Sequence, residues 1–275
     1  HLHTPHVVHL HDTRAWTSSG RFGYRCRRAL YRLLVVKSHA CFVACADAVK
    51  ERFVVSLGIS ASRIRVVRNA VDPQRWSAAP SAERGSLVFG SAGRLQPEKG
   101  HGQLIGAVGQ LARRGIACRL RIAGGGSRRG AYAALATELG IGDRVELCGR
   151  IANMHSFYNS LDVFVLPSVS AEGLPMTILE SMAMRRPVIA TDVAGAREVL
   201  TDGVNGLLVP PNDVPALARA MERVAGDLPL RERLAETAHR AILSSFSRAR
   251  LVREMAETYD NITSGATSAS APPPT

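Results

Sequence analysis

Short apolar runs alternate with amphipathic segments through the middle of the sequence, and this alternation restricts the fold more than any other feature. Runs typical of strands lie at Leu87–Gly93, Cys118–Ala123, Val145–Cys148, Val163–Leu166, Val188–Thr191 and Leu207–Val209. Apolar residues with helical spacing lie at His101–Arg114, Ala131–Leu139, Met154–Ser160, Pro175–Met184, Val214–Val224 and Arg231–Leu243. Strands that alternate with helices predict an α/β fold, in which helices cover both faces of a parallel sheet.

A complete doubly wound domain is predicted at residues 85–243, because six strands fall within about 125 residues. A shorter unit precedes it, with strand runs at Val7–Leu10, Cys41–Ala44 and Ile64–Val67 and helix runs at Arg27–Val36 and Ala48–Ser56. This is about half of a second doubly wound domain, which needs roughly six strand–helix units. We therefore expect the N-terminal domain to be incomplete in this chain.

These patterns divide the chain into four segments. Residues 1–84 hold the partial N-terminal Rossmann-like domain and a polar connector, and residues 85–243 hold the complete Rossmann-like domain. Residues 244–263 are expected to form a helix that returns toward the N-terminal domain. Residues 264–275 are rich in Ser, Ala and Pro and are expected to be disordered.

The positive charge of the chain is concentrated near its start. The 275 residues include 35 Lys and Arg against 23 Asp and Glu, a net charge of +12. Seven basic residues and no acidic one lie in Arg14–Lys37, interleaved with apolar side chains. This segment fits either peripheral contact with an anionic membrane or an ordinary solvated helix face. Nucleic-acid binding is not favoured, because aromatic residues make up only 5% and no nucleic-acid motif is present.

The cysteines and the apolar runs indicate a cytoplasmic protein. Five cysteines are an odd number without a CxxC pair, which favours reduced thiols. The sequence has no run of about 18 apolar residues, so we expect no membrane-spanning helix. A peripheral position at the inner membrane face is compatible with both observations.

Two glutamates form the strongest candidate site. Glu172 follows the strand run VFVLPS, and Glu180 lies eight residues later in a predicted helix. Ligands of open parallel sheets bind at the carboxyl ends of the strands, and a helix N-terminus there favours an anion. The two carboxylates could then bind hydroxyl groups of one ligand. Taken alone, such a pair is equally compatible with solvated helix residues.

A second candidate site is the loop GRLQPEKG at Gly93–Gly100, which also connects a strand to a helix. Arg94 and Lys99 flank this loop, and both can reach a phosphate. Gly93 and Gly100 would allow close approach of the backbone. The loop lacks the GxxxxGK[ST] pattern, and a charged surface loop is the alternative. Three glycines at 124–126 more simply form a turn.

His11 follows the first predicted strand and is a third candidate. An imidazole in this position could contact or polarise a ligand group. A hydrogen-bonded loop histidine is the alternative.

Together these motifs resemble the retaining nucleotide-sugar glycosyltransferases of family 4, which have the two-domain GT-B fold. The resemblance runs from about His11 to Tyr259. It rests on Glu172-GLPMTIL-Glu180, the GRLQPEKG loop, VRNAVD at Val67–Asp72, PVIATD at Pro187–Asp192 and GVNGLLVP at Gly203–Pro210. Two departures from the family pattern are Ala70 and Pro175, each at a position where glycine is usual.

The resemblance implies catalytic roles for Arg94, Lys99, Glu172 and His11, and a donor-binding role for Glu180. Arg94 and Lys99 would neutralise the donor diphosphate and the charge on the leaving nucleoside diphosphate. Glu172 would bind hydroxyls of the transferred sugar, and Glu180 would bind the ribose hydroxyls. His11 would contact the transferred sugar from the N-terminal domain.

The resemblance also implies donor-binding roles outside these five residues. Arg150 and Ile151 would border the base, and the backbone amides of Leu174 and Met176 would bind the sugar and diphosphate. Asn69 would contribute from the interdomain motif. Pro175 has no N–H, so one donor of the loop is lost or replaced.

The implied activity is a hexosyltransferase-type transfer from a UDP-, GDP- or ADP-sugar to a glycan or lipid-linked acceptor, with retention of anomeric configuration. The resemblance implies no obligatory metal and a place in polysaccharide or glycolipid biosynthesis. A non-catalytic protein of the same fold that binds or scaffolds sugar nucleotides is the alternative.

Overall fold

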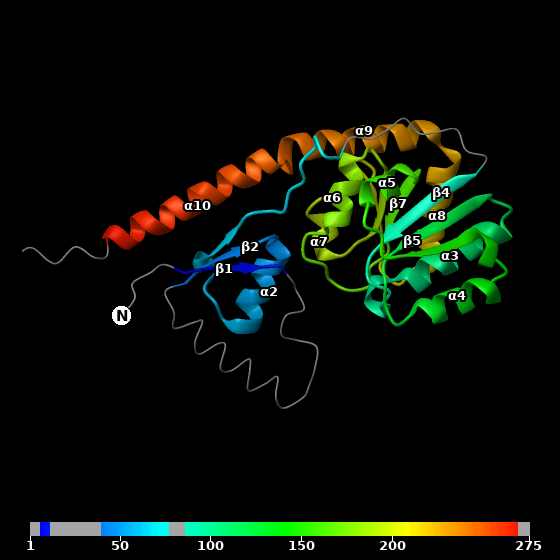
Figure 1. The fold of residues 1–275 in the computed structure, drawn as a ribbon, viewed down its shortest axis with the longest axis horizontal. Coiled ribbons are helices and arrows are strands. Elements are labelled where there is room, and N and C mark those ends of the chain that lie inside the picture. The colour runs from blue at the N-terminus through cyan, green and yellow to red at the C-terminus, as the bar shows by residue number, and fades with distance from the viewer. Residues whose placement is uncertain (1–5, 12–39, 77–85, 269–275) are drawn as a thin grey trace, which may run out of the picture. The chain divides into compact units, whose positions relative to one another are not determined.

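The computed structural model describes residues 6–11, 40–76 and 86–268, with side chains as far as residue 264 (Figure 1). The chain forms two compact units. The first contains the residues up to Ala70 together with those from Arg248 onward, and the second contains Val71–Ser247. Among the described residues, no helix combines the length and the apolar character needed to cross a bilayer.

The N-terminal unit contains a parallel sheet in the order β1-β2-β3. Its elements are β1 (Val7–Leu10), β2 (Cys41–Ala44), α2 (Asp47–Leu57), the 3-10 turn η1 (Ala61–Arg63), β3 (Ile64–Val66) and α10 (Arg248–Ser268). Phe42, Phe53 and Ile64 are buried between the strands and α2. The guanidinium of Arg250 donates to the carbonyl of Arg68 over 2.6 Å, which attaches α10 to the end of the sheet.

The C-terminal helix is longer than predicted. We expected disorder from Ser264, but α10 continues to Ser268. Its hydroxyl side chains bond to carbonyls one turn back, Thr263 to Tyr259 over 3.0 Å and Ser264 to Asp260 over 2.6 Å, and such bonds are compatible with a helix. The predicted helix Arg27–Val36 and the basic segment Arg14–Lys37 lie outside the described residues.

In the part of the chain that the structure describes, the C-terminal unit holds a six-stranded sheet in the order β6-β5-β4-β7-β8-β9, with every pair parallel. The strands are β4 (Leu87–Ala92), β5 (Cys118–Ala123), β6 (Val145–Gly149), β7 (Val163–Leu166), β8 (Val188–Thr191) and β9 (Leu207–Val209). The predicted doubly wound α/β sheet is confirmed.

The helices of this unit follow the strands in alternation. They are η2 (Pro97–Lys99), α3 (His101–Arg113), α4 (Arg129–Glu138), η3 (Gly142–Arg144), α5 (Met154–Asn159), α6 (Met176–Ala183), α7 (Ala194–Arg197), α8 (Val214–Gly226) and α9 (Leu228–Ser245). Asp213 and Asp227 cap the N-termini of α8 and α9, because their carboxylates accept from backbone N–H groups of the first turn over 2.8 Å.

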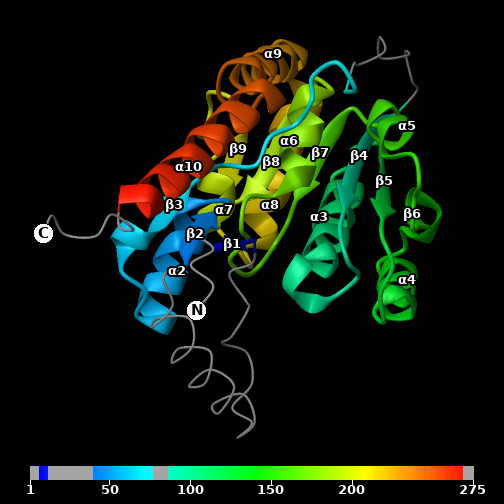
Figure 2. The ribbon, with the colours of Figure 1, turned by 60° about the vertical axis from the view of Figure 1, so that its left-hand side comes forward.

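The sheet is buried on both faces. α3 packs against α4 and α8 on one face, over a core that includes Val163 and Val165 of β7. Phe164 lies between these two residues and therefore points to the opposite face, where its ring contacts Tyr158 of α5. α6 packs against β7, β8 and α9 (Figure 2). Because both faces are covered, the ends of the strands are left for ligand binding.

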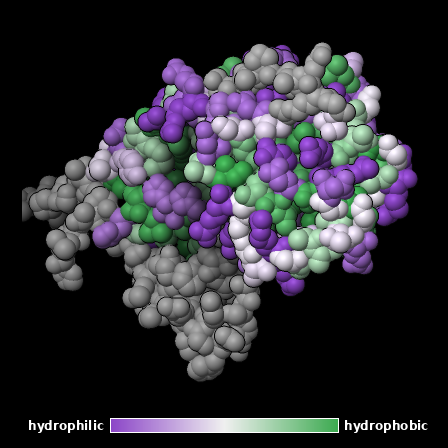
Figure 3. Space-filling model, turned by 45° about the vertical axis from the view of Figure 1, so that its right-hand side comes forward, coloured by the Kyte–Doolittle hydropathy of each residue, from purple (hydrophilic) through white to green (hydrophobic). Residues whose placement is uncertain are grey.

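The boundary between the units lies at 70/71, whereas the sequence placed it at 84/85. The described part of the connector groups with the C-terminal unit for two reasons. The N–H of Val71 donates to the carbonyl of Phe246 over 3.0 Å, and the ring of Trp76 packs on Tyr158. On the face of the molecule in Figure 3, hydrophilic and apolar side chains are interspersed.

Candidate functional site

The connections of the C-terminal sheet diverge between β4 and β7, which are neighbours in its centre. β4 continues to β5 on one side, and β7 continues to β8 on the other. This is a topological switch point, and ligands of open parallel sheets bind at such a point, outside the carboxyl ends of the strands. The loop Gly93–Gly100 follows β4, and the segment from Pro167 to Pro175 follows β7. The two strongest sequence motifs therefore meet at this switch point.

Lys99 and Glu172 form an ion pair across the switch point. The Lys99 Nζ lies 2.5 Å from Oε1 of Glu172, and the two side chains are 19% and 16% exposed. The hydroxyl of Ser168 donates to the same Oε1 over 2.5 Å. Among the described residues, Oε2 of Glu172 has no partner, so one oxygen of this carboxylate remains for a ligand hydroxyl.

Backbone contacts hold the two loops against each other. The N–H of Val169 donates to the carbonyl of Glu98 over 3.0 Å. Gly100 has a φ of +69°, and a Cβ there would lie 1.8 Å from the carbonyl oxygen of Pro167. Thr191 of β8 donates to the carbonyl of Ser168 over 2.5 Å. Gly100 therefore allows the close backbone approach that the sequence predicted, and the neighbouring group is the carbonyl of Pro167.

Arg94 lies at the other end of the same loop. Its side chain is 55% exposed, and its guanidinium pairs with Glu98 over 3.3 Å. The structure therefore places both predicted cations on one loop but in different settings. Lys99 is paired and largely buried, whereas Arg94 is in solvent and can turn toward an incoming anion.

Glu180 lies in the second turn of α6, the helix that follows the segment from Pro167 to Pro175. The hydroxyl of Tyr158 donates to its Oε2 over 2.8 Å. Burial raises the pKa of Glu180, and the hydrogen bond from Tyr158 acts in the opposite direction. As at Glu172, one carboxylate oxygen is held by a hydroxyl group of the protein.

The segment before α6 contains the predicted amide donors Leu174 and Met176. Leu174 is buried, and Met176 is exposed as the first residue of the helix. Pro175 is extended and supplies its carbonyl to the N–H of Ile178 over 3.2 Å. Amides in the first turn of a helix have no partner within the helix, so the N–H of Met176 is available in spite of the proline.

The glycine turn after β5 supports the loop Gly93–Gly100. The N–H of Leu95 donates to the carbonyl of Gly125 over 2.9 Å. A Cβ on Gly124 would lie 1.8 Å from the carbonyl oxygen of Gly93. The structural interpretation of these glycines is therefore confirmed. Arg150 follows β6, with its side chain against Gly125, and Ile151 is half-buried next to it.

His11 and Asn69 belong to the N-terminal unit. His11 directly follows β1 and is exposed, and its ring stacks on His9 with centroids 6.0 Å apart. The carbonyl of Asn69 accepts from Arg250 over 3.4 Å. The roles of these two residues in donor binding remain predictions.

Three supporting residues were not identified from the sequence: Ser168, Tyr158 and His101. Ser168 was identifiable in part, because a hydroxyl residue at a strand end four positions before Glu172 is a possible donor to it. A tyrosine inside a short apolar helix predicts only that its hydroxyl needs a partner, without naming that partner. His101 gives no sequence signal of its own.

His101 is the first residue of α3 and is only 1% exposed. Its Nδ1 lies 3.5 Å from the hydroxyl of Ser91, and a Cβ on Gly93 would be 3.5 Å from its Nε2. Burial lowers the pKa of His101 to about 4, and the charge of Lys99 adds to the effect. His101 is therefore a neutral residue packed against the loop Gly93–Gly100.

This histidine should make stability depend on pH. Between pH 6.5 and about 4, His101 is protonated in the unfolded chain but not in the folded chain. The free energy of unfolding therefore decreases as the pH is lowered through this range. At pH 4.5 the loss from this group is about 2 kcal/mol. Urea unfolding at pH 7.5 and 4.5 should show a drop about 2 kcal/mol smaller for His101→Gln than for wild type. Equal drops in both proteins would contradict the buried neutral state.

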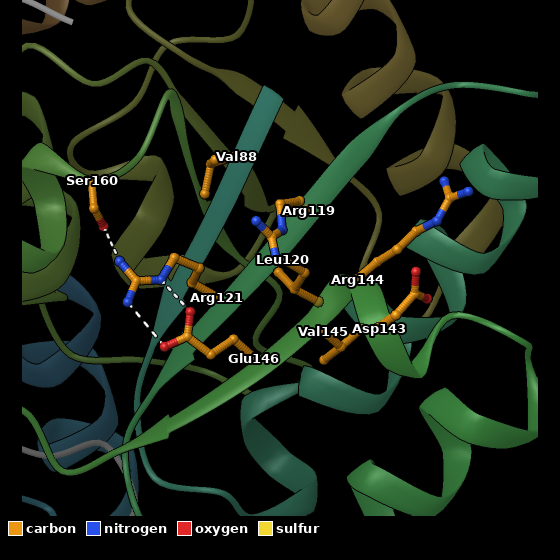
Figure 4. Close-up of a pocket in the computed structure, with 9 residues that line it drawn as sticks. All are labelled: Val88, Arg119, Leu120, Arg121, Asp143, Arg144, Val145, Glu146 and Ser160. Carbon is orange, nitrogen blue, oxygen red and sulfur yellow. Dashed lines mark hydrogen bonds and ion pairs between the residues drawn. The ribbon is translucent and has the colours of Figure 1, made fainter. Parts of the chain in front are cut away.

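A cavity of about 590 Å³ lies at the opposite, amino-terminal edge of the sheet (Figure 4). Its lining includes Arg119, Arg121 and Glu146. The guanidinium of Arg121 already has partners in the protein, because it pairs with Glu146 over 2.7 Å and donates to the hydroxyl of Ser160. Neither Lys99 nor Glu172 lines this cavity.

Comparison with known proteins agrees with this geometry. Residues 73–241 match the family described as Glycosyl transferases group 1, and residues 1–75 match Glycosyltransferase Family 4. The first match alone covers more than half of the chain. The chain belongs to the group 1 glycosyl transferases.

Two curated relatives of this group 1 chain are bacterial enzymes. It is 42% identical over 150 residues to alpha-D-kanosaminyltransferase of Streptomyces kanamyceticus, a match that covers 53% of this chain and 38% of that protein. It is 36% identical over 221 residues to lipopolysaccharide core biosynthesis glycosyltransferase LpsE of Rhizobium meliloti, covering 79% of this chain and 63% of LpsE. The chain thus spans less than two thirds of either relative.

The fold is shared with HepE of Anabaena, solved in complex with UDP. The two superpose with a TM-score of 0.83 at 24% identity, over 94% of this chain and 72% of HepE. HepE has also been solved with UDP-glucose. The likeness confirms the predicted GT-B fold with Rossmann-like domains.

Proposed function

We propose that this chain carries the donor site of a retaining hexosyltransferase that moves a sugar from a UDP-, GDP- or ADP-sugar to a glycan or lipid-linked acceptor. The observation that carries the proposal is the Lys99–Glu172 pair across the switch point of the sheet. A cation and a carboxylate at this place suit a ligand with an anionic diphosphate next to a neutral, hydroxyl-rich sugar. The HepE complexes with UDP and UDP-glucose support a donor of this class.

In the proposed reaction, cationic side chains stabilise the leaving group. The bond from the anomeric carbon to the diphosphate oxygen breaks, and negative charge develops on the nucleoside diphosphate. Lys99 and Arg94 neutralise that charge. Because these cations take the place that a metal would have, we propose that no metal is obligatory.

Retention follows if the acceptor approaches on the face that the diphosphate leaves. The leaving phosphate oxygen then takes the proton of the acceptor hydroxyl as the new glycosidic bond forms. Glu172 holds the sugar through its hydroxyls during this exchange, and Glu180 holds the ribose. No carboxylate nucleophile is required.

LpsE, whose name refers to the lipopolysaccharide core, supports a glycan or lipid-linked acceptor. We place the protein in the cytoplasm, with peripheral membrane contact through Arg14–Lys37. Sedimentation with vesicles tests this contact: binding to vesicles that contain anionic lipid, and none to neutral vesicles, is the expected result. Equal sedimentation with both would contradict it.

A donor panel tests the proposed function directly. UDP-, GDP- and ADP-glucose are each added to the chain at one and the same concentration, and thermal unfolding is recorded. One donor should stabilise the fold more than the other two, by about 2.7 kcal/mol where the concentration is about 100 times its dissociation constant, which is a rise in Tm of a few degrees. Transfer of labelled sugar by the full-length protein is then measured with that donor, and the anomeric configuration of the product is determined by NMR.

Three outcomes would contradict parts of the proposal. If no donor changes the Tm, the donor site is wrong. Binding without turnover on any acceptor would instead support a non-catalytic protein that binds sugar nucleotides. An inverted product would leave the donor site intact and contradict retention.

A further inference from the structure

Tyr158 is a fully buried residue of α5, and its hydroxyl contacts Glu180 of the proposed donor site. It donates to Oε2 of Glu180 over 2.8 Å, and the carbonyl of Thr177 lies 3.4 Å from the same hydroxyl. A buried tyrosine hydroxyl needs a partner, and a carboxylate is the stronger acceptor of the two. The hydroxyl is therefore committed to Glu180.

The ring of Tyr158 is held on several sides by other aromatic rings. Trp76, Phe157 and Phe164 contact it edge-on, with ring centroids 5.7, 5.8 and 5.6 Å away. These three residues come from the connector, from α5 and from β7. Since the ring has little freedom to move, its hydroxyl has one position, and the bound carboxylate oxygen is fixed as well.

Glu180 has no other such support. Among the described residues no basic side chain pairs with it, and its Oε1 has no partner. Burial disfavours its charged form, and the hydrogen bond from Tyr158 opposes that effect. The same burial raises the pKa of Tyr158 well above its usual value, so the hydroxyl remains protonated and can donate. Tyr158 thus orients this carboxylate and favours its charged form.

We propose that Tyr158 is a positioning residue for donor recognition, because its hydroxyl fixes Oε2 of Glu180 and leaves Oε1 to bind the ribose hydroxyls. The inference rests on the proposed function, which assigns the ribose to Glu180. It adds a residue from a different element that touches no ligand itself. The parallel with Glu172, where Ser168 holds one oxygen, indicates a common design for both glutamates.

The test compares a nucleotide that has ribose hydroxyls with one that lacks them. Binding of UDP and of 2′,3′-dideoxy-UDP to the chain is measured by calorimetry, and GDP and ADP are run with their dideoxy forms in the same way. Tyr158→Phe removes only the hydroxyl and keeps the ring inside its aromatic contacts. We expect it to weaken binding of the ribonucleotide about tenfold and to leave the dideoxynucleotide unchanged.

Two further variants separate this inference from the proposed function. Glu180→Gln should also abolish the preference for the ribose hydroxyls. Tyr259→Phe removes a tyrosine hydroxyl from α10, in the other unit, and should leave both affinities unchanged. The ratio of the two affinities does not depend on the folded fraction, because unfolded protein lowers both equally.

The outcomes are distinct. If Glu180→Gln loses the ribose preference but Tyr158→Phe keeps it, the positioning role is wrong and the donor site stands. If Glu180→Gln keeps the preference, the assignment of the ribose to Glu180 fails, and the role of Tyr158 fails with it. If the wild-type chain binds none of the three nucleotides, the proposed function itself is overturned.

Discussion

Replacing Lys99 with alanine is expected to lower kcat/KM for sugar transfer about 100- to 1,000-fold. In the proposed reaction the leaving diphosphate gains negative charge, and Lys99 is the largely buried cation at that place. A cation in a site with little water stabilises developing charge more than one in solvent does. Initial rates at several donor concentrations, with donor and acceptor varied separately, measure the effect.

The ion pair adds a second reason for this large effect. Without Lys99, the carboxylate of Glu172 keeps its hydrogen bond from Ser168 but loses its counter-charge. A carboxylate that is 16% exposed would then repel the incoming diphosphate. The double variant Lys99→Ala/Glu172→Ala should therefore bind the nucleoside diphosphate more tightly than Lys99→Ala alone.

Arg113→Ala is the matched control for loss of a cation. Arg113 is exposed in the last turn of α3, at the end of the helix opposite to Lys99. Its loss should leave the kinetics unchanged. Glu172→Ala, measured beside it, should lower kcat because the sugar is no longer held. Turnover of both site variants within about threefold of wild type would contradict the site assignment.

Much of this site could be predicted because open parallel sheets bind ligands at the carboxyl ends of their strands. Once Val163–Leu166 was identified as a strand, Glu172 had to follow its carboxyl end, and the same reasoning placed Lys99 after β4. The order of the strands was needed to bring the two together. The structure supplies that order, in which β4 and β7 lie side by side.

The residues that support the two glutamates could not be predicted, because they depend on packing between distant segments. Tyr158 meets Glu180 across 22 positions of sequence, and Trp76 meets Tyr158 across 82. No periodicity encodes such contacts. The boundary at 70/71 was missed for the same reason, since it depends on the bond from Val71 to Phe246, near the other end of the chain.

Gly100 shows what a sequence leaves open about a glycine. The predicted close approach of the backbone is present at this position. Sequence alone shows that a glycine permits close approach, but it does not show what approaches. In the structure the neighbour is the carbonyl of Pro167, so this glycine joins two loops of the protein.

Gly100→Ala should consequently cost about 3 kcal/mol or more in the free energy of unfolding. The backbone at this position has a φ of +69°, a left-handed conformation that residues other than glycine adopt only at a cost in free energy. The added Cβ would also overlap the Pro167 carbonyl oxygen, 1.8 Å away, so the loop after β7 has to move. Urea unfolding of wild type and variant at pH 7.5 measures the loss.

Gly115→Ala separates the two contributions. Gly115 has a φ of +76°, nearly the same as Gly100, but a Cβ there would meet no atom within 4 Å. This variant should lose only the conformational part, about 1 kcal/mol, and keep full transfer activity. Gly100→Ala should in addition lose activity, because the same contact fixes Lys99 against Glu172. If the two variants are equally stable and equally active, the contact between Gly100 and Pro167 does not hold the donor site together.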